Sequence, residues 1–197
     1  MKILLFSGGI DSTAIAWWRR PERLFFVDYG QLAAAGELRA AQSIAKDVGL
    51  PLDVRKISLR SFGHGAMADG KILNAQAPEF WPYRNQMLLT LAGMAYAADK
   101  VESLIVGSVA GDERHPDGTD AFRSTINRIF EVQGGPKVEA PASKLSTEQL
   151  IEKSAVPLSV LGWTFSCHRG EWACGSCNGC IKHNQVMDNA TLTRSSR

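Results

Sequence analysis

Short apolar segments alternate with longer amphipathic segments along this chain, and this alternation limits the possible folds more than any other feature. Strands are predicted at residues 2–6, 24–28, 52–59 and 103–109, with a weaker fifth at 137–140. The segments between them carry apolar residues at helical spacing. Strands that alternate with helices favour a parallel sheet covered on both faces by right-handed crossovers. We therefore predict an α/β, Rossmann-like fold with a five-stranded parallel sheet.

Two helices are predicted from their apolar stripes, and a third from its N-terminal cap. The first stripe is Glu37, Ala41, Ile44 and Val48; the second is Tyr83, Met87, Leu91 and Ala95, which assigns Tyr83 to the core. Ser146 with Gln149 three residues later predicts a capping box. The long irregular stretch at 60–82 is predicted to be a lid or binding loop.

The bulk composition narrows the function classes. The chain has 197 residues, 45% of them hydrophobic, so it can bury a full core. A net charge of +2 with scattered basic residues makes nucleic-acid binding an unfavoured reading. No apolar stretch near 18 residues and no charged leader appear, so we expect a cytoplasmic protein without membrane contact. A composition shift after Pro157 divides the expected main domain, 1–160, from a C-terminal segment, 161–197.

The stretch Ser7–Thr13, which reads SGGIDST, directly follows the first predicted strand. Gly8 and Gly9 let the backbone turn sharply and present N–H groups to an anion. Ser12 and Thr13 add hydroxyl donors, and the following helix offers its positive end. A Walker loop is excluded, because no lysine follows and the glycines are adjacent. The pattern indicates a phosphate-binding turn; the alternative is a tight turn with a polar helix cap.

Other polar residues follow the later strands. In an open parallel sheet, ligands bind beyond the carboxyl ends of the strands, where the strand order reverses. We therefore expect Asp28–Glu37, Gly107–Asp117 and the helix start at Arg84 and Asn85 to share one rim with Ser7–Thr13.

All four cysteines lie close together, as Cys167, Cys174, Cys177 and Cys180. Four thiolates at this spacing suit a structural zinc ion in a reducing compartment. An iron–sulfur cluster is the alternative, since C-x2-C-x2-C also occurs in ferredoxins. If all four bind metal, no thiol remains for sulfur transfer or for releasing ammonia, so an amine must arrive from outside.

The SGGIDST stretch resembles the PP-loop of the ATP pyrophosphatases, also called adenine nucleotide alpha hydrolases. The resemblance implies ATP as co-substrate, a magnesium ion, and attack of a substrate oxygen on the α-phosphorus. It assigns ATP binding to Ser7, Gly8, Gly9, Asp11, Ser12, Thr13, Asp28 and Gly107.

Further motifs resemble one family within this class, the 7-cyano-7-deazaguanine synthases. They are Asp28-Tyr29-Gly30-Gln31 with Glu37, Pro82-Tyr83-Arg84-Asn85, Gly107 with Asp112, His115-Pro116-Asp117, and Ser166-Cys167 leading into the cysteine cluster. The resemblance implies an ATP-dependent ligase that adenylates the carboxylate of 7-carboxy-7-deazaguanine, forms amide and nitrile with ammonia, and works as a homodimer. It implies an adenine nucleotide alpha hydrolase-like fold with a C-terminal zinc knuckle.

The resemblance also assigns roles to individual side chains. The expected substrate-binding residues are Tyr29, Gln31, Glu37, Arg84, Asn85, Asp112 and Asp117, and the expected catalytic residues are Asp11, Ser12, Arg84 and Lys144. The chain departs from the family pattern at Thr147, where lysine is usual, with Lys144 as a nearby substitute, and at His115 and Gly118.

Three other functions stay open at this stage. One is a defence-system paralogue that attaches a deazaguanine to a partner protein. Another is a PP-loop tRNA-modifying enzyme. The third is a zinc-bearing nucleic-acid or interaction module whose loop no longer binds nucleotide, which the near-neutral charge disfavours.

Overall fold

The computed structural model describes residues 1–71, 77–112 and 115–195. Five parallel strands form one sheet in the order β3-β2-β1-β4-β5. Their bounds are Lys2–Leu5 for β1, Arg23–Asp28 for β2, Leu52–Lys56 for β3, Ser103–Ile105 for β4 and Lys137–Glu139 for β5. The predicted α/β fold with a five-stranded parallel sheet is therefore confirmed.

The strand order reverses between β1 and β4, which lie side by side although about 100 residues separate them. The chain builds outward from β1 to β3, then returns across β1 to β4 and β5. The turns that follow β1 and β4 therefore diverge to opposite faces of the sheet and leave a crevice between them.

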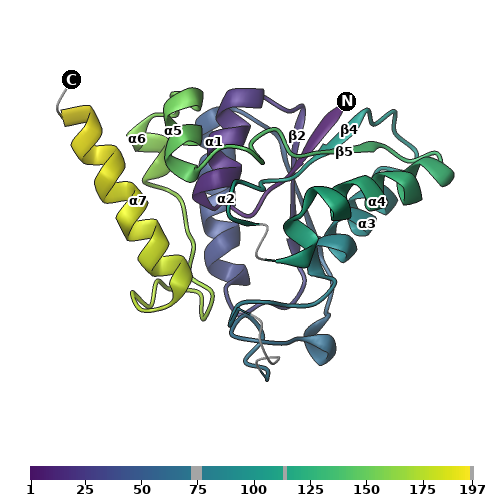
Figure 1. The fold of residues 1–197 in the computed structure, drawn as a ribbon, viewed down its shortest axis with the longest axis horizontal. Coiled ribbons are helices and arrows are strands. Elements are labelled where there is room, and N and C mark those ends of the chain that lie inside the picture. Colours follow the sequence, from purple (N-terminus) through teal and green to yellow (C-terminus); the bar gives the residue numbers. More distant parts are fainter. Residues whose placement is uncertain (72–76, 113–114, 196–197) are drawn as a thin grey trace.

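Helices cover both faces of the sheet (Figure 1). One face carries α1, α2, α5, α6 and α7, and the other carries α3 and α4. Their bounds are Ile10–Arg19 for α1, Ala34–Val48 for α2, Arg84–Ala95 for α3, Asp120–Val132 for α4, Thr147–Ser154 for α5, Leu158–Leu161 for α6 and Asn178–Ser195 for α7. Among the described residues, none of these helices is apolar over the length that a membrane span requires.

Neighbouring strand residues point into the two opposite cores. Ile3 and Phe25 pack toward α3 and α4, whereas Leu4 and Phe26 pack toward α1 and α2, and all four are at most 1% exposed. Since both faces are covered, the central strands β1, β2 and β4 contain continuous apolar runs, whereas the edge strands β3 and β5 carry charged residues. The C-terminal helix joins the first core through Val186.

Two local predictions need correction. Four strands are shorter than expected, since β1 ends at Leu5, β3 at Lys56, β4 at Ile105 and β5 at Glu139. After β4 the chain leaves the sheet because the following residues, Val106 to Ser108, line the pocket, and Asp112 Oδ2 accepts a hydrogen bond from Val109 N at 3.0 Å.

The predicted apolar stripe of α3 is only half right: Leu91 and Ala95 pack against the core, but the other two residues do not. Tyr83 is 76% exposed and precedes the helix in a left-handed conformation, and Met87 is also exposed. The buried residues of the helix are Leu89 and Ala92. From Met87 onward the helix has apolar residues on all sides, so the spacing alone did not select the buried face. By contrast, both hydrogen bonds of the predicted Ser146–Gln149 capping box are present.

Candidate functional site

A cavity of about 550 Å³ opens at the point where the strand order reverses. It is lined by the turns after β1, β2 and β4, by the start of α3 and by the C-terminal segment. Its volume lies within the range of small-molecule sites. The parallel sheet thus brings the predicted rim segments to one cavity.

The turn after β1 forms one end of the cavity. Gly9 is the N-cap of α1 and no side chain caps this helix, so the first N–H groups of α1 are available to an anion. The hydroxyls of Ser12 and Thr13 donate to the carbonyl oxygen of Gly9 at 3.1 and 2.8 Å. Gly107 approaches this turn closely, since a Cβ at Gly107 would meet Ser12 at 3.5 Å.

Gly8 is required by both space and backbone conformation. Its φ is +76°, and an added Cβ would lie 2.9 Å from the Ala41 nitrogen and 3.0 Å from the Glu37 carbonyl oxygen. The turn therefore packs directly on the backbone of α2. Gly8 also accepts a hydrogen bond from Phe165 N at 3.0 Å, which ties the turn to the C-terminal segment.

Asp11 lies in the first turn of α1 at the same end of the cavity. Its Oδ2 lies 3.4 Å from the Lys182 ammonium, and its buried Oδ1 has no hydrogen-bond partner among the described residues. Thr147, which also lines the cavity, has a buried Oγ1 that makes no hydrogen bond of good geometry, but its hydroxyl lies near enough to Asp11 to lower the pKa of that carboxyl. Burial raises the pKa of Asp11, and the charge of Lys182 opposes that shift. An unpartnered carboxylate oxygen here suits a magnesium ion, which prefers oxygen ligands.

The other end of the cavity contains a buried polar chain. Gln31 is 4% exposed, and its Nε2 donates to Glu37 Oε2 at 2.7 Å while its Oε1 accepts from Tyr29 N at 2.9 Å. Burial raises the pKa of Glu37, and the Gln31 hydrogen bond and the charge of Arg84 oppose that rise. Tyr29 packs edge-to-face on Trp81, with ring centroids 5.2 Å apart. Gln31 thus fixes the position of the Glu37 carboxylate.

Arg84 and Asn85 enter the cavity from the start of α3. Burial alone would lower the pKa of Arg84, but the phenol of Tyr29 and the carboxylates of Asp117 and Glu37 raise it overall. Asp117 Oδ2 accepts from Asn85 N at 3.4 Å. This end of the cavity therefore holds one fixed cation among several hydrogen-bond acceptors.

The segment around His115 forms the cavity wall between the two ends. The His115 ring stacks on Phe80 at 5.8 Å, and its Nε2 lies 3.7 Å from Glu79 Oε1. A Cβ at Gly118 would lie 2.3 Å from the Asp112 carbonyl oxygen, which is why this position accepts only glycine. Met67 and Glu79 bring the described parts of the 60–82 stretch to the cavity; residues 72–76 lie outside the described residues.

The four cysteines form a cluster beside the cavity. Their sulfur atoms all lie within 4.8 Å of one another, and Cys174 and Cys180 Sγ are 3.9 Å apart. Tetrahedral zinc with Zn–S bonds of about 2.3 Å needs sulfur atoms about 3.8 Å apart. Hydrogen bonds from the backbone amides of Ser176 and Cys177 lower the pKa of Cys174 to about 6. The donor set and its geometry fit a zinc ion, so the cluster could form the predicted knuckle.

The C-terminal segment lines the cavity as well. Ser166 Oγ and His183 Nδ1 lie at hydrogen-bonding distance, 3.1 Å, and both line the cavity together with His168. Burial lowers the pKa of His183. A Cβ at Gly179 would lie 1.9 Å from the Ser166 carbonyl oxygen, so α7 begins in direct backbone contact with this segment.

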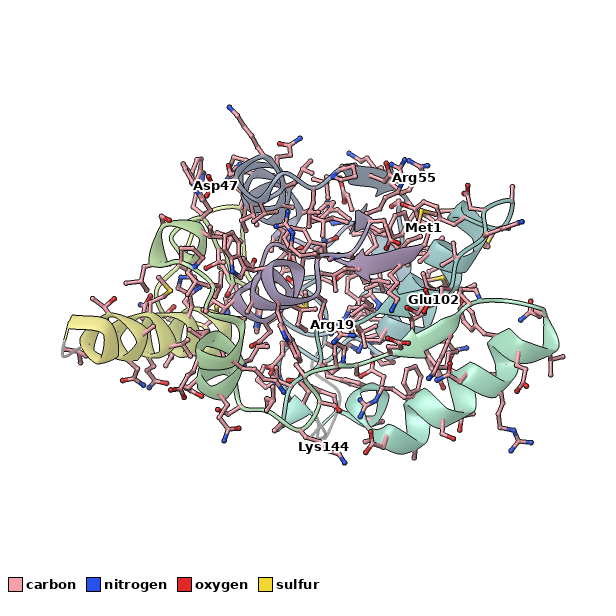
Figure 2. All side chains as sticks on the ribbon, turned by 90° about the horizontal axis from the view of Figure 1, so that it is seen from above. Met1, Arg19, Asp47, Arg55, Glu102 and Lys144 are labelled. Carbon is pink, nitrogen blue, oxygen red and sulfur yellow. The ribbon has the colours of Figure 1, made fainter. Side chains whose placement is uncertain are left out.

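The structure brings most of the predicted site residues together. Those that line the cavity are Ser7, Gly9, Asp11, Ser12, Tyr29, Gln31, Glu37, Arg84, Asn85, Gly107, Asp112 and Asp117. Gly8 and Thr13 support the turn from behind, and Asp28 accepts a hydrogen bond from Gly30 N and pairs with Lys56. Lys144 is exposed and outside the lining; Figure 2 shows it at the periphery of the molecule.

Sequence reasoning missed Lys182, Glu79 and Asn178, all of which line the cavity. Lys182 stands two residues after Cys180, and nothing in its spacing marks it as a site residue. Its position could have been predicted only from its closeness to Cys180, because a cysteine cluster that packs beside a ligand pocket brings its flanking residues to that pocket.

The fold and the site together define a doubly wound α/β protein with a glycine-rich turn at an uncapped helix start and a four-cysteine cluster. The family model described as queuosine biosynthesis protein QueC matches residues 1–191. The chain therefore belongs to the QueC family.

Several curated relatives cover nearly the whole chain. A 7-cyano-7-deazaguanine synthase 1 of Desulfitobacterium hafniense is 30% identical over 201 residues, which covers 94% of this chain and 90% of the relative. A 7-cyano-7-deazaguanine synthase of Methanosarcina barkeri is 26% identical over 219 residues, covering 95% and 94%. The synthase of Pseudomonas aeruginosa PAO1 is 29% identical over 201 residues, covering 90% and 89%.

Proposed function

We propose that this protein is an ATP-dependent ligase that converts 7-carboxy-7-deazaguanine to 7-cyano-7-deazaguanine with ammonia. The names of the relatives supply the product. The single observation that carries the proposal is the cavity itself, which joins an anion-binding turn at one end to a fixed set of acceptors and one cation at the other.

The reaction proceeds through two activations. The carboxylate oxygen attacks the α-phosphorus of ATP, the bond to the bridging oxygen breaks, and pyrophosphate leaves. Ammonia attacks the resulting acyl adenylate, so that AMP and a proton leave and the amide forms. A second ATP adenylates the amide oxygen with loss of a second pyrophosphate and of one N–H proton. Loss of AMP and the remaining N–H proton then forms the nitrile.

The phosphate end of the pocket supports the first step. The free N–H groups at the start of α1 would bind the phosphates, and Ser7 and Ser12 lie beside them. Asp11, with its unpartnered Oδ1, would hold the magnesium ion. When bound, that ion supplies positive charge against the phosphates. This kind of transfer depends on positioning and charge neutralisation.

The base end supports the choice of substrate. A guanine-like ring presents N–H donors, and Glu37 and Asp117 are carboxylates that accept them. Arg84 offers a planar cation for the substrate carboxylate. Gln31 holds Glu37 in position, and Tyr29 packs behind it. Asn85 and Asp112 complete this wall.

The cysteine cluster would hold a structural zinc ion at residues 161–197, a segment that packs on an ATP pyrophosphatase domain formed by 1–160. Zinc bound by all four thiolates leaves no thiol for sulfur transfer, which argues against a tRNA-thiolating enzyme. We also propose a cytoplasmic homodimer on the basis of the family. Neither the family model nor the named relatives favour the attachment of a deazaguanine to a partner protein over this reaction.

The test is an assay of the purified protein with ATP, magnesium, ammonia and 7-carboxy-7-deazaguanine. We expect AMP and pyrophosphate only when the base is present, and product masses of the amide and the nitrile. The control base is 7-deazaguanine without the carboxylate, which should give no AMP. Equal AMP with both bases would refute the proposal. An adduct on a coexpressed partner protein would indicate the defence reaction instead.

A further inference from the structure

Lys182 places an ammonium group at the phosphate end of the cavity, although it belongs to the C-terminal helix. It lies in the first turns of α7, two residues after Cys180, and its side chain is 49% exposed. Its Nζ lies 3.4 Å from Asp11 Oδ2, and it lines the cavity beside the turn at Gly9. The contact joins residues that are 171 positions apart in the chain.

The two arginines that line the described part of the cavity interact with other groups, away from the start of α1. Arg84 is surrounded by Tyr29, Glu37 and Asp117 at the base end. Arg123 donates to the Gly118 carbonyl oxygen at 2.6 Å and pairs with Asp120. Of the three lysine and arginine residues in the described lining, Lys182 is therefore the one beside the start of α1.

The surroundings of Asp11 point to a ligand at this position. Asp11 Oδ1 and Thr147 Oγ1 are buried polar atoms that make no hydrogen bond of good geometry, although the Thr147 hydroxyl, in a side chain only 4% exposed, lies near enough to Asp11 to lower the pKa of that carboxyl. Unpartnered buried polar atoms are costly unless a ligand or water satisfies them. Together with the uncapped start of α1, they mark a site for an anion and its counter-cation rather than a solvated helix end.

We propose that Lys182 is the phosphate-binding cation of this pocket, whose ammonium exchanges Asp11 for the pyrophosphate that leaves ATP. This inference rests on the proposed adenylation. As the α-phosphorus is attacked, the electron pair of the broken bond moves to the departing phosphate oxygen, and Lys182 neutralises that charge without transferring a proton. A lysine suits this exchange because its flexible stem lets one ammonium reach two acceptors.

The test measures the binding of inorganic pyrophosphate by calorimetry and the single-turnover formation of AMP. For Lys182→Ala and Lys182→Met we expect pyrophosphate affinity to fall at least about tenfold and AMP formation to fall about 100-fold. Lys182→Met keeps the apolar stem, and the zinc content and thermal midpoint of both variants check folding. Lys182→Arg should restore part of the affinity. The matched control is Lys46→Ala, an exposed lysine of α2, which should behave as wild type.

Asp11→Asn supplies a second readout that a structural role of Lys182 would not produce. In buffer without magnesium and without chelator, so that the zinc stays bound, this variant should bind pyrophosphate about fivefold more tightly than wild type, because Asp11 no longer competes for the ammonium or repels the anion. Adding Lys182→Ala should abolish that gain. Unchanged pyrophosphate binding by Lys182→Ala, or an equal loss in Lys144→Ala, would overturn the inference.

The same experiments separate this inference from the proposed function. If wild type forms base-dependent AMP while Lys182→Ala binds pyrophosphate normally, only the role of Lys182 fails. If wild type forms no AMP but Lys182→Ala still loses pyrophosphate, the proposed reaction fails and the phosphate-binding cation stands.

Discussion

The parallel sheet and the segment around the four cysteines both border the pocket, yet they bury very different amounts of apolar side chain. Ile3, Leu4 and Phe25 are among many sheet residues that are at most 1% exposed. In the C-terminal segment, Trp163 and Trp172 are 54% and 71% exposed. Around the cysteines, the buried cluster of described residues consists of Cys167, Cys177 and Cys180 with Phe165 packed beside it.

The sheet side and the C-terminal side of the pocket are therefore stabilised by different interactions. The sheet holds the anion turn through close packing, since Gly8 contacts the backbone of α2. The C-terminal segment has little core of its own, so we expect the proposed zinc ion to fix its conformation. A mutation in one of these two regions should therefore destabilise that region without unfolding the other.

The largest effect is expected from breaking the cysteine cluster. Cys177→Ser should abolish zinc binding, because serine is a poor zinc ligand and the remaining thiols cannot close the site; a structural zinc contributes about 10–16 kcal/mol to ordering such segments. Pyrophosphate affinity should fall with it, since Lys182 lies two residues after Cys180 in α7. Metal analysis and hydrogen exchange check this expectation.

Far-UV circular dichroism of Cys177→Ser tests whether the sheet stays folded when the C-terminal segment is disordered. The sheet should remain folded while residues 162–182 exchange rapidly. Gln185→Ala, an exposed change on α7, should keep its zinc. Global unfolding of Cys177→Ser, or full zinc content, would contradict the separate stabilisation of the two regions.

A smaller effect is expected where the turn packs on α2. Gly8→Ala should destabilise the protein by about 2–4 kcal/mol, because it adds a clash to an unfavourable positive φ. Gly134→Ala is the matched control, since its φ is +68° and nothing lies within 4 Å of its added Cβ. It should cost only about 1 kcal/mol. Urea unfolding measures both, and equal losses would show that the contact with α2 is unimportant.

The sequence predicted the sheet side of the molecule better than the C-terminal side. Apolar runs and the Ser7–Thr13 stretch depend on local patterns, and the structure shows a sheet and an uncapped helix start there. The position of Lys182 depends on how α7 packs against α1 through α5 and α6, which no local pattern encodes. The buried face of α3 was mispredicted in part for the same reason, because the tertiary contacts select Leu89 over Met87.

A pH-dependent effect is expected at Glu37. Burial raises its pKa above the ordinary value of 4.5, so the folded protein binds this proton more tightly than the unfolded chain. Stability from this group is complete below pH 4.5 and is lost as the pH rises through the raised value. Glu37→Gln stays neutral and keeps an acceptor for Gln31. It should therefore gain about 1 kcal/mol over wild type at pH 7 and nothing at pH 4.

Urea unfolding at a series of pH values tests this prediction, with Glu131→Gln on the exposed side of α4 as control. The variant should also raise the KM for the deazaguanine acid, because one acceptor for the base has been lost. A constant difference between Glu37→Gln and wild type across the pH range would refute the linkage.

The smallest effect is expected where the C-terminal segment docks on α2. The Arg39 guanidinium lies 4.2 Å from the centroid of the Trp172 ring and donates to the Glu171 carbonyl oxygen. Both partners are exposed, so Arg39→Ala should cost only about 0.5–1 kcal/mol. Hydrogen exchange at 165–177 should rise slightly, while Arg39→Lys should keep part of the protection. A loss as large as that of Cys177→Ser would mean that docking, rather than metal, orders the segment.

The most direct test of the proposed chemistry follows the substrate oxygen. The base is supplied with oxygen-18 in its carboxylate, and the AMP released in a single turnover is weighed by mass spectrometry. Attack by the carboxylate on the α-phosphorus predicts AMP that carries one labelled oxygen, together with unlabelled pyrophosphate. Unlabelled AMP, or label in any other phosphate product, would contradict adenylation at the turn after β1.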